Sequence, residues 1–341
     1  MAVIKSWMVV AAGITAAMGA SVAAAASPTV SLYGEFDMAV GRTYSDAAKT
    51  GMVSGYTGDT KIGFKGSEDL GQGVKLNFQL EASQLDGSTG AWTGGFKRQS
   101  WLGFSGKFGD FKMGRTTTPQ NRAMGQFDLN GSADSSALEV LGLAANGSFV
   151  GSRESNQLQY ITPRWNGVQA WVAYGFSETV RGAPNAKRNF MQVAGTYKTG
   201  GLTLGAAYQP ERFATQAVSN NNYRDGYSVG AKYDFGVVKT SVLYTRNPHV
   251  TDGEGWGVGV MAPLGAWELG VQFARVSKAK KANGHTSDKQ GAHAVELFTN
   301  YSLSKRTTLY GAYGTVDSRT TEHAFGLQHG NTAALGITHA F

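Results

Sequence analysis

Hydrophobic and polar residues alternate along most of this chain, in segments of about ten residues that end in turns. Residues 74–81 show the pattern clearly, with apolar Val74, Leu76, Phe78 and Leu80 between polar Lys75, Asn77, Gln79 and Glu81. A period of two indicates a β-strand, because successive side chains of a strand point to opposite faces. No long stripe with the helical period follows residue 26, so the alternation predicts an all-β protein.

Sixteen such segments can be counted, beginning near residues 29, 59, 74, 96, 108, 153, 168, 188, 202, 223, 237, 254, 267, 290, 307 and 329. Short turns, such as 164–167 and 263–265, alternate with longer polar loops, such as 46–58 and 278–288. A tilted strand of about 9–11 residues crosses a bilayer. This alternation and the even strand number predict a closed antiparallel transmembrane β-barrel of sixteen strands.

Residues 1–26 follow a different pattern. Lys5 precedes an apolar run from Trp7 to Ala20, and four small residues, Ala23–Ala26, end the segment. This order is typical of a secretory signal peptide, whereas a membrane anchor, the alternative, usually has more Leu, Ile and Phe and flanking charges. We predict cleavage after Ala26, which leaves residues 27–341 as one barrel domain.

A soluble β-sandwich or β-helix is the alternative for the rest of the chain. In a sandwich, the facing surfaces of two sheets are apolar and their outer surfaces are polar and exposed to water. The aromatic residues near strand ends instead suit girdles at two membrane interfaces, namely Tyr160, Trp165, Trp171, Tyr197, Tyr208, Tyr233, Trp256, Trp267, Tyr301 and Tyr310. The chain also ends in Phe341 on an amphipathic strand. That ending resembles the C-terminal signal by which Gram-negative outer-membrane proteins are recognised for barrel assembly.

The composition excludes several classes of function. The chain has no Cys, so it can form neither a disulfide nor a thiolate site. Its six His lack metal-ligand spacing and no catalytic or nucleotide motif occurs, so we expect no cofactor, no metal and no enzyme. Gly255, Gly257 and Gly259 alternate within one strand, which indicates close packing or a flexible strand. The net charge of +7 is scattered, which favours a positive lumen or anionic lipopolysaccharide over nucleic acid.

Five segments carry a family resemblance: Val30–Asp37, Lys61–Gly71, Arg98–Phe104, Phe108–Arg115 and Tyr301–Thr307. Together they resemble the Gram-negative general diffusion porins, especially the beta-proteobacterial type of Burkholderia, Bordetella and Neisseria. The resemblance implies a homotrimer in the cell outer membrane, in contact with lipid and lipopolysaccharide. It also implies export through the periplasm with chaperones and the barrel-assembly machinery, and passive diffusion of small hydrophilic solutes and ions.

The longest interval between predicted strands, residues 116–152, is the candidate constriction loop. A loop of this length is usually functional, and a sixteen-stranded barrel is too wide for its own side chains to fill. In the resembled family the third external loop folds inward and narrows the pore, and this segment occupies its place. Its carboxylates, Asp128, Asp134 and Glu139, are therefore candidates for the acidic side of the constriction.

Three cations are candidates for the opposite, basic wall. Lys61 alternates with Ile62 and Phe64, so periodicity alone turns it inward. Arg98 is ambiguous, because alternation from Leu102 and Phe104 turns it outward while an outward Trp101 turns it inward. The family resemblance decides for the inside, and it also assigns Arg153 to the wall. An excess of such cations predicts weak to moderate anion selectivity.

Three other functions fit an exported barrel. A substrate-specific channel for a phosphorylated or carboxylated nutrient would need an aromatic slide and a denser basic track. A barrel lipase or protease would need a Ser/His or Asp/His set near the rim, and none is recognisable. An adhesin or receptor would need larger external loops than these.

Overall fold

The computed structural model describes residues 29–44, 49–83, 85–92, 94–143, 152–176, 189–210, 225–246, 254–277, 291–318 and 330–341. The strands are β1 Thr29–Arg42, β2 Gly51–Ser54, β3 Lys61–Gly71, β4 Val74–Ala82, β5 Gln99–Gly106, β6 Gly109–Thr117, β7 Arg153–Ile161, β8 Val168–Gly175, β9 Phe190–Thr199, β10 Leu202–Gln209, β11 Gly226–Asp234, β12 Lys239–Arg246, β13 Glu254–Leu264, β14 Trp267–Val276, β15 Ala292–Ser302, β16 Thr307–Ser318 and β17 Gly330–Ala340. Three short helical segments join them, α2 Pro119–Met124, η2 Gly125–Phe127 and α3 Ala137–Val140.

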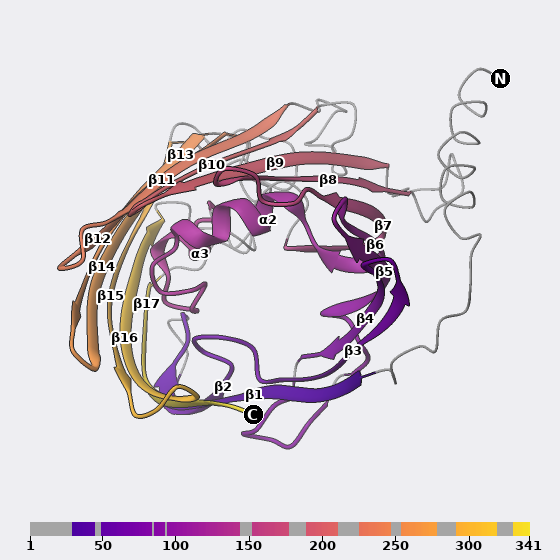
Figure 1. Cartoon of the computed structure of the whole chain (residues 1–341). Helices are drawn as coiled ribbons and strands as arrows, with labels where there is room; N and C mark the ends of the chain where they lie inside the picture. Colours follow the sequence, from indigo (N-terminus) through magenta and orange to yellow (C-terminus); the bar gives the residue numbers. More distant parts are fainter. Residues whose placement is uncertain are drawn as a thin grey trace, which may run out of the picture.

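The strands form one closed antiparallel barrel, seen along its axis in Figure 1. Each strand pairs with its neighbours in sequence, and β17 pairs with β1 to close the ring. β2 and β3 lie on the same side of β1, with Met38 opposite Ser54 and Glu35 opposite Lys61. They therefore act as two halves of one barrel strand, and the predicted sixteen-stranded barrel is confirmed. The predicted signal peptide, residues 1–26, lies outside the described residues.

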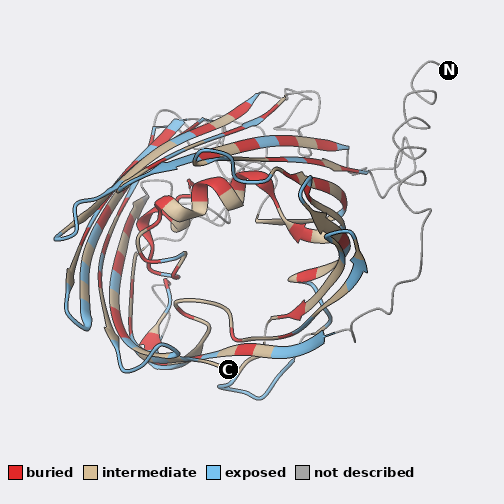
Figure 2. Ribbon diagram, viewed as in Figure 1, coloured by how far each residue is buried: buried red, intermediate tan, exposed pale blue. Residues whose placement is uncertain are grey.

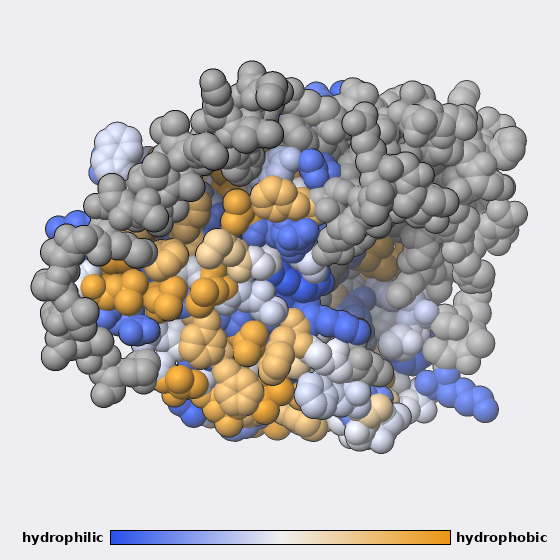
Figure 3. Space-filling view, turned by 90° about the vertical axis from the view of Figure 1, so that its right-hand side faces the viewer, coloured by the Kyte–Doolittle hydropathy of each residue, from blue (hydrophilic) through white to orange (hydrophobic). Residues whose placement is uncertain are grey.

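Buried and exposed residues alternate along many of the strands (Figure 2), as expected when successive side chains point to opposite faces of the wall. In β13, Trp256, Val258 and Val260 are exposed on the outside, whereas the glycines between them are buried. Figure 3 shows apolar residues gathered on the outer face of the strands at the right of Figure 1. An apolar outer face on a closed barrel suits the hydrocarbon of a membrane. Among the described residues, no helix is long and apolar enough to cross a membrane.

Two aromatic residues of the predicted girdles lie inside the barrel instead. Trp171 is buried in the apolar cluster on the inner face, and Tyr310 is buried with its hydroxyl donating to Asp37 Oδ1 at 2.5 Å. Both occupy inward positions of their strands, and distance from a strand end does not reveal which face a residue takes. Trp256 and Trp267 are exposed on the outside, as expected.

The C-terminal Phe341 lies at the seam where the barrel closes. Its backbone N–H donates to Gly34 O at 3.1 Å, and its carbonyl accepts from Gly34 N at 3.2 Å. A Cβ atom at Gly34 would lie within 2.3 Å of Phe341 Cζ, so only glycine leaves room for the ring here. The terminal residue thus packs on the first strand, and its role in barrel assembly stays a prediction.

The segment between β6 and β7 folds into the barrel, where α2 and α3 lie within the ring of strands (Figure 1). α2 contacts β8 to β11, and α3 contacts β14 to β16. We call residues 118–143 the inner loop. The expected loop began at 116, but β6 continues to Thr117, and residues 144–151 lie outside the described residues.

Candidate pore constriction

Apolar packing holds the inner loop against one half of the wall. Buried Met124, Phe127, Leu138, Leu141 and Leu143 form one cluster with inward-facing side chains of the strands. Small wall residues make this possible. A Cβ atom at Gly230 would lie 2.6 Å from Phe127 Cδ2, and one at Gly255 would lie 2.3 Å from Leu143 Cδ2. The alternating glycines of β13 therefore leave space for the loop, as the expectation of close packing anticipated.

A buried polar network fixes the loop at a second point. The Asp128 carboxylate accepts hydrogen bonds from the Ser136 hydroxyl at 2.5 Å and Gln272 Nε2 at 2.8 Å. Gln272 also donates to Glu296 Oε2 at 2.7 Å, and Glu296 Oε1 accepts from Asn130 Nδ2 at 2.6 Å. Asp128 is only 5% exposed. The structure thus places it behind the loop, against the wall, and not on the pore surface where we expected it.

This network predicts a pH-dependent contribution to barrel stability. Burial raises the pKa of Asp128 above its usual range near 4, even though four hydrogen bonds to its carboxylate oppose the shift. A group whose pKa is higher in the folded than in the unfolded protein stabilises the fold at low pH. This stabilisation is lost as pH rises through the pKa of the folded state. We expect the difference in thermal midpoint between wild type and Asp128→Asn to change as pH rises above the usual carboxyl pKa near 4. Parallel midpoint curves would contradict this, and Asp234→Asn at the exposed end of β11 is the control.

The tip of the inner loop reaches the opposite side of the barrel. There the chain between β2 and β3, residues 55–60, turns inward, and Asp37 Oδ2 accepts from the N–H groups of Thr57 at 2.7 Å and Gly58 at 3.1 Å. The Asp134 N–H donates to Tyr56 O at 2.7 Å. The Asp134 side chain is exposed, and Glu139 on α3 is half-buried. Of the three predicted carboxylates of the loop, Asp134 and Glu139 therefore lie nearer to the lumen than Asp128.

Two of the predicted wall cations are neutralised by carboxylates. Lys61 Nζ lies 2.6 Å from Glu35 Oε2, an inward side chain of β1. Arg98 forms ion pairs with Glu81, whose Oε1 is 2.5 Å from Nε, and with Asp59. Arg98 lies just before β5, so the alternation of the strand does not determine where its side chain points. The side chain forms an ion pair with Glu81, which points inward. These pairs add local dipoles to the wall and little net charge.

The third predicted cation, Arg153, belongs to a group without such partners. Lys112 on β6, Arg122 on α2 and Arg153 at the start of β7 form no ion pair with any carboxylate in the described part of the chain. Burial lowers the pKa of Arg122, and the charge of Arg153 lowers it further. The positive charge of Arg122 in turn repels the positive charge of Lys112. We call Lys112, Arg122 and Arg153 the unpaired basic group.

Sequence reasoning missed two members of this group. Lys112 lies between Phe111 and Met113 in a strand, so alternation could have found it. Arg122 lies on a short helix within the loop, where no strand period applies. The described residues contain no cluster of His, Asp or Glu that could hold a metal ion.

Comparisons with known proteins agree with this architecture. The fold matches an anion-selective porin from Comamonas acidovorans, with a TM-score of 0.74, 28% identity, and coverage of 92% of this chain and 100% of the other. Outer membrane porin protein 32 of Delftia acidovorans is 28% identical over 96% of this chain and 98% of its own length. Major outer membrane protein P.IB of Neisseria meningitidis is 27% identical over 94% and 97%. Residues 10–321 match the Gram-negative porin family. The chain therefore belongs to the Gram-negative porin family, whose members are channel proteins of the outer membrane and not enzymes.

Proposed function

We propose that this porin forms a water-filled channel for passive diffusion of small hydrophilic solutes and ions, with a weak to moderate preference for anions. The unpaired basic group carries the proposal. Its three cations lie where the inner loop meets the wall of β6 and β7, and none of them forms an ion pair with a carboxylate among the described residues. Two buried acids, Asp128 and Glu296, are hydrogen-bonded behind the loop.

Charge separation across the narrowed lumen supplies the selectivity. Asp134 and Glu139 belong to the inner loop, whereas Arg153 begins strand β7 of the wall, and the ion-paired Lys61 and Arg98 add dipoles on the wall. Such an arrangement makes a transverse field, in which a polar solute can align its dipole while an apolar solute must break ordered water. Net positive charge at the narrow point then raises the local concentration of anions.

Family membership supports the wider assignments. One related structure is described as anion-selective, which agrees with the proposed preference. We propose a homotrimer in contact with outer-membrane lipid and lipopolysaccharide, exported through the periplasm with chaperones. Phe341 would serve as the signal for the barrel-assembly machinery, and residues 1–26 would be cleaved as a signal peptide.

The reversal potential across a salt gradient tests the proposed function. Purified protein is inserted into a planar bilayer, with KCl at about 1 M on one side and 0.1 M on the other, where the Debye length is about 10 Å. We expect a potential whose sign shows that chloride permeates faster than potassium, together with ohmic conductance. A potential of cation-selective sign would overturn the anion preference, and absence of conductance would overturn the channel itself.

A further inference from the structure

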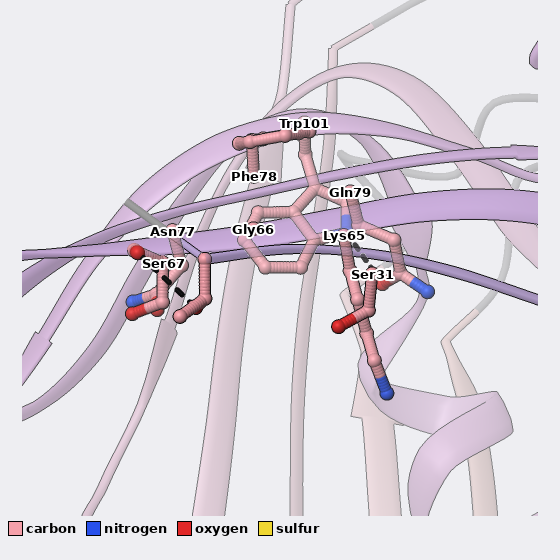
Figure 4. Close-up of a pocket in the computed structure, with 9 residues that line it drawn as sticks. Ser31, Lys65, Gly66, Ser67, Asn77, Phe78, Gln79 and Trp101 are labelled. Carbon is pink, nitrogen blue, oxygen red and sulfur yellow. Dashed lines mark hydrogen bonds between the residues drawn. The ribbon is translucent and has the colours of Figure 1, made fainter. Parts of the chain in front are cut away.

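A pocket on the inner wall adjoins the constriction described above. It has a volume of about 430 Å³ and is lined by residues of β1, β3, β4 and β5, near the end of the barrel with short turns. Figure 4 shows Trp101, Lys65 and Ser31 close together in this pocket. Ser67, Asn77 and Gln79 also line it. The pocket therefore combines an aromatic ring, one cation, and several hydroxyl and amide groups.

A chain of hydrogen bonds fixes the aromatic rings at this place. Trp101 Nε1 donates to Gln79 Oε1 at 3.2 Å, and Gln79 Nε2 donates to the Tyr33 hydroxyl at 2.6 Å. Tyr33 in turn donates to Glu81 Oε2 at 2.7 Å. A Cβ atom at Gly63 would lie 2.5 Å from Tyr33 Cζ, so the Tyr33 ring lies across this glycine. The rings are thus held in position before any ligand arrives, which lowers the entropic cost of binding.

Two ammonium groups accompany these rings. Lys112 Nζ lies 4.0 Å from the centroid of the Trp101 ring, and Lys65 Nζ lies 5.1 Å from that of Tyr33. Neither lysine is paired with a carboxylate of the described residues. A cation over an aromatic face gains modest energy at a hydrated site, and it keeps donors for a negatively charged ligand. Lys65 lines the pocket itself, so an anion bound there can reach its ammonium group.

The groups around the pocket fit a solute that combines a sugar ring with a carboxylate. A pyranose ring can place its C–H face on the side of the Trp101 indole away from Lys112, and its hydroxyls can bond to Ser31, Asn77 and Gln79. A carboxylate on the same ring can bond to Lys65. A neutral sugar leaves the ammonium without a partner, and a small aliphatic acid leaves the indole face uncovered.

We propose that this pocket is a binding site for sugar acids of the uronate class, which pause there on their way through the channel. The inference rests on the proposed diffusion function and adds a preferred solute to it. Contacts of this kind, formed in water, give weak and readily reversible binding, so the site can concentrate the solute without blocking its passage.

Current block in planar bilayers tests this inference. Glucuronate is added to single wild-type channels at constant ionic strength, and the ion current is recorded against its concentration. We expect a saturable reduction of current, whereas glucose and acetate at the same concentrations leave the current unchanged. Lys65→Gln should raise the half-blocking concentration about tenfold, the order expected for loss of one charge-assisted bond, and Trp101→Leu should also raise it, because the indole face is lost.

Lys75→Gln is the matched control, because Lys75 shares the inward face of β4 with Asn77 and Gln79 but does not line the pocket. It removes the same charge from the lumen and should leave the half-blocking concentration within about twofold. Equal effects of Lys65→Gln and Lys75→Gln, or a block that never saturates, would overturn the site. The reversal potential of the same channels in KCl reports separately on the proposed function, so failure of one is distinguishable from failure of the other.

Discussion

Replacement of Arg122 and Arg153 by Glu should turn the channel from anion-preferring to cation-preferring. The double variant changes four units of charge within the unpaired basic group and leaves Lys112 as its only cation. Two unit charges at 4 Å in water interact by about 1 kcal/mol, so the ratio of chloride to potassium permeability should fall at least about tenfold. The measurement is the reversal potential at low salt, where screening is weak.

The control for this prediction is Lys305→Glu with Arg306→Glu, which changes the net charge by the same amount in an exposed turn between β15 and β16. It should leave the sign of the reversal potential unaltered. If both double variants shift the potential equally, the overall charge of the barrel sets selectivity, and the unpaired basic group has no special role.

Removal of the side chains that seat the inner loop should widen the pore. Met124 and Phe127 are fully buried, and both pack against Gly205 of the wall. Truncation of both to Ala removes packing of roughly 5 kcal/mol or more, because a buried Phe or Met each contributes several kcal/mol. The strand ladders remain intact, so we expect a folded barrel with larger single-channel conductance and frequent transitions between conductance levels.

Phe235→Ala is the corresponding control, because Phe235 is 59% exposed in the turn between β11 and β12. Its conductance should equal that of wild type. An unchanged, steady conductance in the Met124→Ala, Phe127→Ala variant would show that the Asp128 and Glu296 network alone holds the loop. Resistance of the barrel to heating in detergent confirms that both variants are folded.

Strand positions were readable from the sequence because lipid on one side and water on the other impose a period of two on every strand. Predicted starts at 74, 153, 168, 202, 254, 267 and 307 coincide with those observed. The expected loop at 46–58 proved to contain β2 and part of the inward turn. This departure depends on a buried carboxylate, Asp37, which satisfies the turn through contacts distant in sequence.

The constriction was less predictable, because charge position within it depends on loop conformation. Asp128 and Asp134 are six residues apart, yet one is buried against the wall while the other is exposed beside Tyr56. Arg122 belongs to the unpaired basic group only because α2 lies on the wall. Trp171 was assigned to a membrane girdle, but it helps to form the apolar cluster under the inner loop.

The glycines that receive the inner loop lie far from it in sequence, and this separation bears on the order in which parts of the barrel fold. Phe127 packs against Gly205 and Gly230, and Leu143 packs against Gly255, so the loop contacts strands that follow it by about a hundred residues. Contacts so distant in sequence form only after the intervening chain has been ordered. The loop therefore cannot be seated until the far half of the sheet exists. Narrowing of the pore is therefore expected to follow, and not to precede, formation of the strands that receive the loop.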